Sequence, residues 1–189
     1  MMKIAFISSL YPPEIMGGAE IVVEKIAKEL IKRGHQIIVI TSSEKFGTEI
    51  HNNIKIYRLP LNIYFLQDFP SQNIIKRTIW QLIDLLNIKA YKKIKKILEK
   101  ETPDIVHIQN YKGLSTLSFK AVKDLNMPLV FTAHDYSPIC IRSNLLNGKG
   151  QICKEQNLPC EIYNQIQRIF IDNKPDIIIA PSNFVLKKL

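Results

Sequence analysis

Short apolar runs alternate with longer amphipathic segments along the chain, which is the pattern of an α/β protein. The first run, residues 3–9, is rich in β-branched and aromatic side chains. From 19 to 33 apolar residues recur every three or four positions, and a nearly continuous apolar run follows at 35–41. Such continuous runs are typical of parallel strands covered on both faces. Residues 3–41 therefore predict a strand-helix-strand unit whose helix ends at Gly34.

Later segments continue this alternation. Apolar positions that step by four or three residues predict a long helix between residues 75 and 97, with a bend at Asn87. We expect its apolar face to be buried; this face consists of Ile75, Ile79, Leu82, Leu86, Ala90, Ile94 and Ile97. The other expected elements are strands at 54–59 and 128–133, helices at 114–125 and 161–173, and a loop with exposed aromatics at 61–69. Together they predict an α/β, Rossmann-like open parallel sheet with helices on both faces.

A short motif occurs twice. Thr102-Pro103-Asp104 precedes the apolar run 105–108, and Lys174-Pro175-Asp176 precedes the run 177–180. Proline fixes the backbone just before each strand begins, so we expect the two copies to occupy equivalent positions in successive α/β units. Ser182 and Asn183 then predict the start of another helix, after which only six residues remain. We therefore expect the chain to be part of a longer protein, with residues 1–189 forming one domain.

Composition narrows the class of protein. Of 189 residues, 46% are apolar, and no apolar run approaches the roughly 20 residues that span a bilayer. The N-terminus lacks the features of a signal peptide, which favours the cytoplasm. The three cysteines are expected to be reduced thiols. The net charge of +9 is compatible with an anionic membrane surface or a phosphorylated ligand, but no nucleic-acid recognition motif accompanies it, so we expect no nucleic acid as partner.

The excess of lysine suggests one possible surface. Lys89, Lys93, Lys96 and Lys100 step along one face of the long helix, joined by Lys92 and Lys95. Together with the aromatic loop at 63–69, this face has the composition of a surface that meets the inner face of an anionic membrane. A solvated helix face and a loop folded over the core fit the same residues, so both interpretations stay open.

Candidate chemistry is expected where strands end, because ligands of open α/β sheets bind beyond the carboxyl ends of the strands. We expect the polar residues that follow the strands to converge on one crevice. Gly17 and Gly18 precede a helix start, where residues without a Cβ let backbone amides approach a phosphate. A plain turn explains them equally well, since neither the dinucleotide fingerprint nor a Walker A motif is present.

His134 directly follows the strand at 128–133, and its ring is placed to donate to a sugar hydroxyl or a developing oxyanion. Asp135 is placed to hold the ring of His134. Alternatively, His134 is simply a histidine hydrogen-bonded at a strand end, and Asp135 caps the next turn. His107 and Asn110 follow or end another strand and are weaker candidates, because a strand histidine is more often packed in the core.

Other catalytic classes receive little support. Cys140, Cys153 and Cys160 have spacings of 13 and 7 residues, with no Cys-x-x-Cys pair, so zinc is a minor alternative to packed thiols. The sequence contains no Asp-x-Asp to hold a divalent ion and no Gly-x-Ser-x-Gly of a hydrolase.

The ordered motifs resemble a known family, the N-terminal domain of retaining glycosyltransferases of family four, which have the GT-B fold. The motifs are Lys3-Ile4-Ala5-Phe6-Ile7, Tyr11-Pro12-Pro13, Gly17-Gly18-Ala19-Glu20, Pro103-Asp104-Ile105-Val106-His107, Thr132-Ala133-His134-Asp135 and Pro181-Ser182. The resemblance implies a two-domain enzyme in which this domain receives the acceptor. A C-terminal donor-binding domain, outside these residues, would hold the nucleotide sugar.

The resemblance also implies roles for single residues. Gly17 and Gly18 would approach the donor phosphate, His134 would contact the transferred sugar as the catalytic residue, and Asp135, His107 and Asn110 would line the acceptor side. The implied reaction transfers a hexose with retention from a nucleoside diphosphate sugar to a glycan or lipid-linked acceptor, without a catalytic metal or cofactor. These residues alone should be inactive. A non-catalytic nucleotide- or sugar-binding module and a peripheral membrane-binding domain remain as alternatives.

Overall fold

The computed structural model describes residues 1–188, and its strands form the expected open sheet. The strands are β1 (Lys3–Ser8), β2 (Gln36–Ser42), β3 (Gly47–His51), β4 (Ile54–Leu59), β5 (Ile105–Ile108), β6 (Leu129–Thr132) and β7 (Ile177–Ile179). Their order in the sheet is β3-β4-β2-β1-β5-β6-β7. All neighbouring strands are parallel except β3 and β4. The predicted Rossmann-like α/β fold is confirmed.

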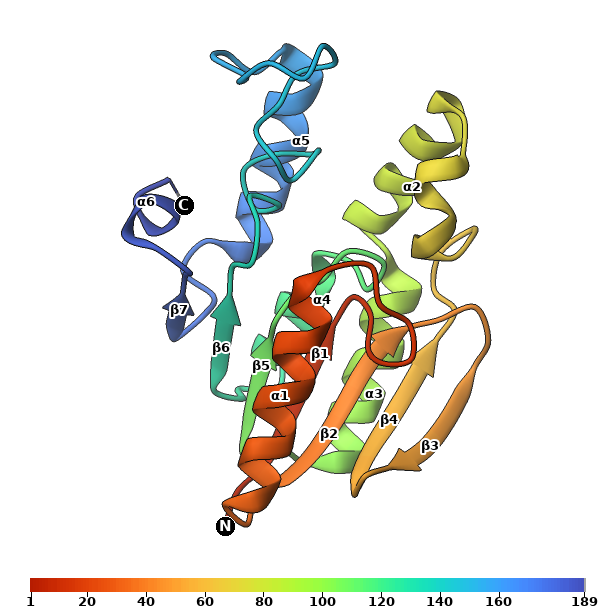
Figure 1. The fold of residues 1–189 in the computed structure, drawn as a ribbon, viewed down its shortest axis with the longest axis vertical. Helices are drawn as coiled ribbons and strands as arrows, with labels where there is room; N and C mark the ends of the chain where they lie inside the picture. Colours follow the sequence, from red (N-terminus) through yellow and green to blue (C-terminus); the bar gives the residue numbers. More distant parts are fainter. Residues whose placement is uncertain (189) are drawn as a thin grey trace.

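Helices cover both faces of this sheet (Figure 1). They are α1 (Gly18–Lys32), α2 (Ile74–Leu85), α3 (Ile88–Glu101), α4 (Leu117–Lys123), α5 (Leu158–Ile171) and α6 (Asn183–Leu186), with a short 3-10 helix at Leu66–Ser71. Alternate residues of β1 serve two cores. Ile4 and Phe6 pack with Val23 of α1, whereas Ala5 and Ile7 belong to the cluster that contains residues of α3 and α4.

The repeated Pro-Asp motif has the same structure in both copies. The Asp104 carboxylate accepts a hydrogen bond of 2.7 Å from the backbone N–H of Lys3, at the start of the neighbouring strand. The Asp176 carboxylate accepts one of the same length from the backbone N–H of Leu129. Each aspartate also donates its own N–H to the carbonyl of the same partner residue at 2.8 Å. The expected equivalence of the two copies is therefore confirmed.

The sequence pattern missed the edge strand β3. Its five residues include Gly47, Thr48 and Glu49, and four of the five are exposed, so no apolar run announces a strand. The predicted bend at Asn87 is a complete break between α2 and α3. Asn87 caps α3 by accepting a hydrogen bond from the N–H of Ala90, while its amide donates to the carbonyl of Leu61 at 2.8 Å.

The apolar face predicted to be buried is divided between the two helices. On α3 the prediction holds, because Ala90 and Ile94 are fully buried. On α2 it is wrong: the same stripe faces solvent, and the buried residues are Trp80, Asp84 and Leu85. Periodicity indicates an amphipathic helix but not which side faces the core.

The aromatic loop that precedes α2 packs against the protein, so of the two interpretations the loop folded over the core is correct and the loop with exposed aromatics is wrong. The ring of Trp80 lies 6.2 Å from that of Tyr64 and 5.2 Å from that of Phe69, measured between centroids. The indole N–H of Trp80 also donates to the carbonyl of Tyr64 at 3.0 Å. Because these contacts use the inward side of α2, they hold its apolar stripe outward.

The end of α1 and the start of α6 lie where the sequence predicts them. Gly34 has a φ of +84° after α1, and the hydroxyl of Ser182 accepts from the N–H of Val185 at the start of α6. None of the helices within residues 1–188 has both the length and the hydrophobicity that crossing a bilayer requires.

Candidate functional site

A cavity of about 550 Å³ lies where the order of the strands reverses. From β1 the chain continues to β2 on one side, whereas β5 pairs with β1 on the other, so loops at their carboxyl ends diverge and leave a crevice. The cavity is lined by Ser9, Leu10, Met16, Gly17, Gly18, Ala19, Glu20, Leu66, Asn110, Lys112, His134 and Asp135. The structure thus brings together five of the six predicted site residues; the sixth, His107, lies behind the cavity wall.

His134 is positioned by a chain of hydrogen bonds from inside the sheet. Its Nε2 lies 2.7 Å from the side-chain oxygen of Gln109, and the amide nitrogen of Gln109 lies 3.2 Å from Nδ1 of His107. Nε2 of His107 lies 2.8 Å from the hydroxyl of Thr132 on β6. His107 is therefore not a group that lines the acceptor side, as expected, but part of the support for His134.

Burial sets the protonation state of the two histidine rings, and the hydrogen bond to Gln109 sets which nitrogen of His134 carries the proton. Burial, together with the nearby His134, lowers the pKa of His107 to about 4, so that ring is neutral at pH 7. Burial also lowers the pKa of His134, against the opposing influence of Asp135 and Glu20. Because a neutral His134 donates its Nε2–H to Gln109, its Nδ1 is the hydrogen-bond acceptor of the ring. This differs from the expected donor role: toward a sugar hydroxyl, neutral His134 accepts.

Asp135 does not hold His134, contrary to one of the two expectations. Its carboxylate accepts a hydrogen bond of 2.7 Å from the backbone N–H of Ser137 and so caps the turn after β6. Gln109 has the positioning role instead. Sequence analysis named the neighbouring Asn110 but not Gln109, because nothing in the sequence shows that the amide of Gln109 faces the ring of His134.

The two glycines lie at the open start of α1. No heavy atom lies within 4 Å of the place where a Cβ of Gly18 would stand, so its backbone can be approached closely. The N–H of Gly17 donates to the carboxylate of Glu20 at 2.9 Å. Because a helix leaves the amides of its first turn without partners inside the helix, the amides after Gly17 point toward any anion in this cavity.

Ser9 adds a polar group that sequence analysis missed. Its side chain is 3% exposed overall, and its hydroxyl has no hydrogen-bond partner within the described part of the chain. Buried hydroxyls are nearly always paired, so this one is an exception, but its oxygen is itself enclosed and does not open onto the cavity.

Lys112 supplies a half-buried cation to the lining of the same cavity. Its ammonium donates to the carbonyl of Ile141 at 2.9 Å, and burial lowers its pKa while Asp135 and Asp84 oppose this effect. Asp84 is fully enclosed, and its carboxylate accepts hydrogen bonds from the backbone of Gly113 and Ser115 at 3.0 and 3.2 Å. Burial raises the pKa of Asp84 to about 7. The aspartate thereby joins α2 to the loop that carries Asn110 and Lys112.

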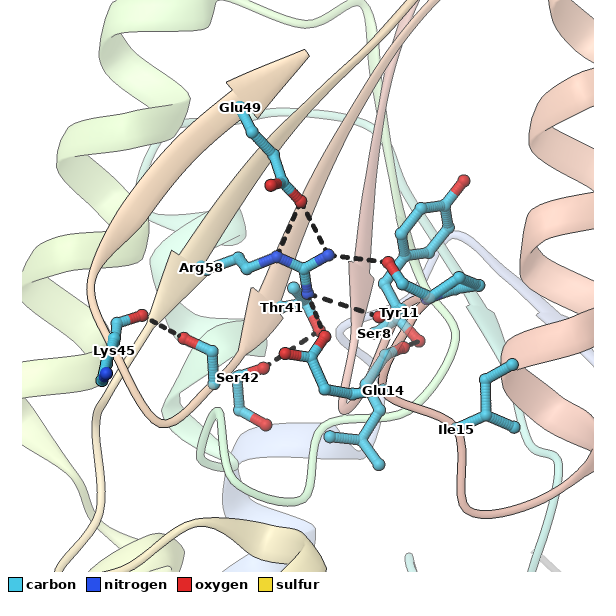
Figure 2. Close-up of polar contacts among 12 residues, drawn as sticks. Ser8, Tyr11, Glu14, Ile15, Thr41, Ser42, Lys45, Glu49 and Arg58 are labelled. Atoms are coloured by element: carbon cyan, nitrogen blue, oxygen red, sulfur yellow. Dashed lines mark hydrogen bonds and ion pairs between the residues drawn. The ribbon is translucent and has the colours of Figure 1, made fainter. Parts of the chain in front are cut away.

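The loop that leads to the glycines is fastened to β4 by Arg58, which Figure 2 shows at the centre of the contacts. Its guanidinium donates to the carbonyls of Tyr11 and Pro12, at 3.3 and 2.6 Å, and pairs with the carboxylate of Glu14. On its other side it binds Glu49 of β3 at 2.7 Å. Arg58 therefore fixes the path of the chain from β1 to Gly17.

A second cavity of about 270 Å³ adjoins the first and shares Leu66 with it. It lies beyond β2 and β4, and its wall includes Ser43, Asn62, Tyr64 and Trp80. Polar groups beside aromatic rings are a common lining of ligand sites.

The three cysteines carry no disulfide bond, and each is half-buried. Within residues 1–188, no group of three or more histidine, cysteine, aspartate or glutamate side chains is arranged to hold a metal ion. The minor alternative of a zinc site at Cys140, Cys153 and Cys160 is therefore not supported.

Comparison with known proteins decides the family. The model of Glycosyltransferase Family 4 matches residues 16–189. The chain belongs to this family. It resembles the "Uncharacterized 42.6 kDa protein in cps region" of Klebsiella pneumoniae, with 31% identity over 99% of this chain and 50% of that protein. It also resembles one subunit of the human phosphatidylinositol N-acetylglucosaminyltransferase, with 24% identity over 97% of this chain and 37% of that protein.

Solved structures agree on the fold of this family 4 chain. A sucrose-phosphate synthase from Thermosynechococcus elongatus has a TM-score of 0.60 at 19% identity, covering 94% of this chain and 42% of that one. The UDP-GlcNAc 2-epimerase of Neisseria meningitidis bound to UDP-GlcNAc has a TM-score of 0.52 at 16% identity. The match covers 99% of this chain and 43% of the epimerase chain. The resemblance to a GT-B half is thus confirmed. The chain spans half the length of the Klebsiella relative and less of the human one.

Proposed function

We propose that the full-length protein transfers a hexose from a nucleoside diphosphate sugar to a glycan or lipid-linked acceptor, with retention of configuration. Residues 1–189 act as its N-terminal, acceptor-side domain, and a C-terminal domain outside this chain binds the donor. The observation that carries the proposal is the cavity at the strand-order reversal, where the start of α1 and His134 line the same space. A helix start suits a phosphate and a neutral histidine suits a sugar hydroxyl.

Each residue then has a defined task. First-turn amides near Gly18 meet the donor diphosphate, and Nδ1 of His134 accepts a hydrogen bond from a hydroxyl of the transferred sugar. Asn110 and Asp135, which line the same cavity, face the acceptor. In this proposal the sugar nucleotide is a substrate, and the reaction needs no metal or cofactor besides.

The names of the relatives support this class of reaction. The human relative is named as part of a phosphatidylinositol N-acetylglucosaminyltransferase, and the Neisseria structure holds a sugar nucleotide. A lipid-linked acceptor would place the protein in the cytoplasm, in peripheral contact with the inner face of the membrane.

The test is to incubate the full-length protein with a panel of UDP-, GDP- and ADP-sugars and candidate acceptors, and to measure nucleotide release and product mass. We expect transfer with at least one donor, and no turnover by residues 1–189 alone. Saturable sugar-nucleotide binding without turnover for every acceptor would instead indicate the non-catalytic binding module.

A further inference from the structure

Glu20, in the first turn of α1, is a buried carboxylate of which the fold uses one oxygen. The residue is 6% exposed and lines the 550 Å³ cavity together with Gly17 and His134. Its Oε2 accepts the hydrogen bond of 2.9 Å from the N–H of Gly17 and so caps the helix. Within residues 1–188, Oε1 has no hydrogen-bond partner, and no cationic side chain lies within 4 Å of the carboxylate.

Helix capping accounts for only one of the two oxygens. Glutamate is rarely buried without a partner, because a charged oxygen that leaves water needs a compensating contact. The positive end of the helix dipole supplies part of this compensation, but it makes no hydrogen bond to Oε1. In contrast to the hydroxyl of Ser9, Oε1 is not enclosed by other atoms, so it opens to the cavity that Glu20 lines. The structure therefore presents a hydrogen-bond acceptor to a ligand in this cavity.

The surroundings restrict the group that Oε1 binds. Burial lowers the pKa of His134, whereas the carboxylates of Asp135 and Glu20 oppose this effect, so Glu20 lies electrostatically close to the ring. A carboxylate repels phosphate, which excludes the donor diphosphate as the partner of Oε1. The other polar groups of sugar substrates are hydroxyls, which donate a hydrogen bond to a carboxylate. The partner of Oε1 is therefore a hydroxyl group.

We propose that Oε1 of Glu20 accepts a hydrogen bond from the attacking hydroxyl of the acceptor. The inference rests on the proposed sugar transfer and adds a substrate-binding residue to it. In that proposal the diphosphate lies at the first-turn amides of α1 and the transferred sugar lies at His134. Glu20 belongs to the same turn as those amides and lies close to His134, so the hydroxyl that it binds stands beside the anomeric carbon.

This contact also defines the acceptor chemically. A hydroxyl that donates to Oε1 keeps its oxygen lone pairs free, and the hydrogen bond orients them toward the carbon that the oxygen attacks. The attacking group is an uncharged hydroxyl, and the product is an O-glycoside. A carboxylate or phosphate at the attacking position would be repelled by Glu20.

The test variant is Glu20→Gln in the full-length protein. Glutamine has the shape of glutamate and keeps an oxygen for the N–H of Gly17, so the free energy of unfolding, measured by chemical denaturation, should be unchanged. With that oxygen committed, the amide nitrogen takes the place of Oε1 and donates a hydrogen bond where the carboxylate accepted one. The matched control is Glu29→Gln in the same helix, where the carboxylate is 52% exposed and lies 3.4 Å from the ammonium of Lys32.

The measurements separate the acceptor from the donor. The acceptor is the glycan or n-octyl glycoside that the full-length protein glycosylates, and the probe is its analogue with hydrogen in place of the attacking hydroxyl. We expect Glu20→Gln to lower kcat/KM for the acceptor roughly 10- to 100-fold, the usual effect of losing a hydrogen bond to a charged group. The Kd of the sugar nucleotide and the inhibition constant of the deoxy analogue should stay unchanged, and Glu29→Gln should alter none of the three quantities.

Three results would overturn the inference while leaving the proposed function intact. Unreduced acceptor kinetics in Glu20→Gln would show that the carboxylate only caps α1. An equal loss of sugar-nucleotide binding would place its contact on the donor. Weaker inhibition by the deoxy analogue would show that the lost contact is not with the attacking hydroxyl. Absence of transfer by the unaltered protein with every donor and acceptor would instead remove the proposed function, and this inference with it.

Discussion

Replacement of His134 by alanine is expected to lower kcat/KM for sugar transfer by roughly 100-fold or more, the usual loss when one aligned polar group of an active site is removed. The ring is half-buried, and its Nε2 is held 2.7 Å from Gln109, which orients Nδ1 as an acceptor. Steady-state kinetics of the full-length protein measure the effect. The folded state should persist, because His134 lies at the cavity wall and not in either core cluster.

The control for this variant is His51→Ala. His51 is an exposed histidine that pairs with Ile54 at the start of β4, at the edge of the sheet opposite the carboxyl ends of the parallel strands, and its removal should leave kcat/KM unchanged. The pH profile gives a second check. Because burial lowers the pKa of His134, the neutral acceptor form persists to a lower pH than that of an ordinary histidine, and the drop in activity on acidification should be displaced in the same direction. Unreduced transfer by His134→Ala would remove its assigned role.

Replacement of Arg58 by alanine is expected to reduce the free energy of unfolding by roughly 3 kcal/mol, because it leaves a half-buried carboxylate and two loop carbonyls without their donor. The side chain of Arg58 is 11% exposed and pairs with both Glu14 and Glu49. Chemical denaturation measures the change. Since the same contacts fix the loop before Gly17, the KM for the donor should also rise at temperatures where the variant is fully folded.

Arg168→Ala is the matched control for the loss of an arginine pair. Arg168 pairs with Asp172 one helical turn away, and both side chains are more than 40% exposed. An exposed pair of this kind contributes less than about 0.5 kcal/mol, so stability and donor KM should hardly change. If Arg58→Ala also left the free energy of unfolding and the donor KM unchanged, the loop before Gly17 would not depend on the guanidinium.

The sequence was sufficient for elements that carry an apolar signal. The buried parallel strands, the Gly34 stop and the Pro-Asp motif could all be predicted, because the chemistry that forms them is local. The edge strand β3 could not, since its residues are polar and pair only with β4. The orientation of α2 could not either, because it depends on Trp80 and Asp84 finding partners many residues away.

Part of the candidate site could be predicted from the sequence as well. The glycines, Asn110, His134 and Asp135 were found because they follow strands, and parallel strands end at one edge. Gln109 and Arg58 were missed, since their partners lie 25 and 44 to 47 positions away along the chain. Serine is common in loops, so nothing in the sequence distinguishes Ser9 as the residue with an unpaired hydroxyl.

The most direct test of the central claim is a crystal structure of the full-length protein with a nucleoside diphosphate sugar. We expect the sugar to lie between the start of α1 and His134, with a hydroxyl about 3 Å from Nδ1 and the diphosphate near the amides that follow Gly17. A sugar bound elsewhere, with the cavity at the β1–β5 junction filled only by water, would contradict the account.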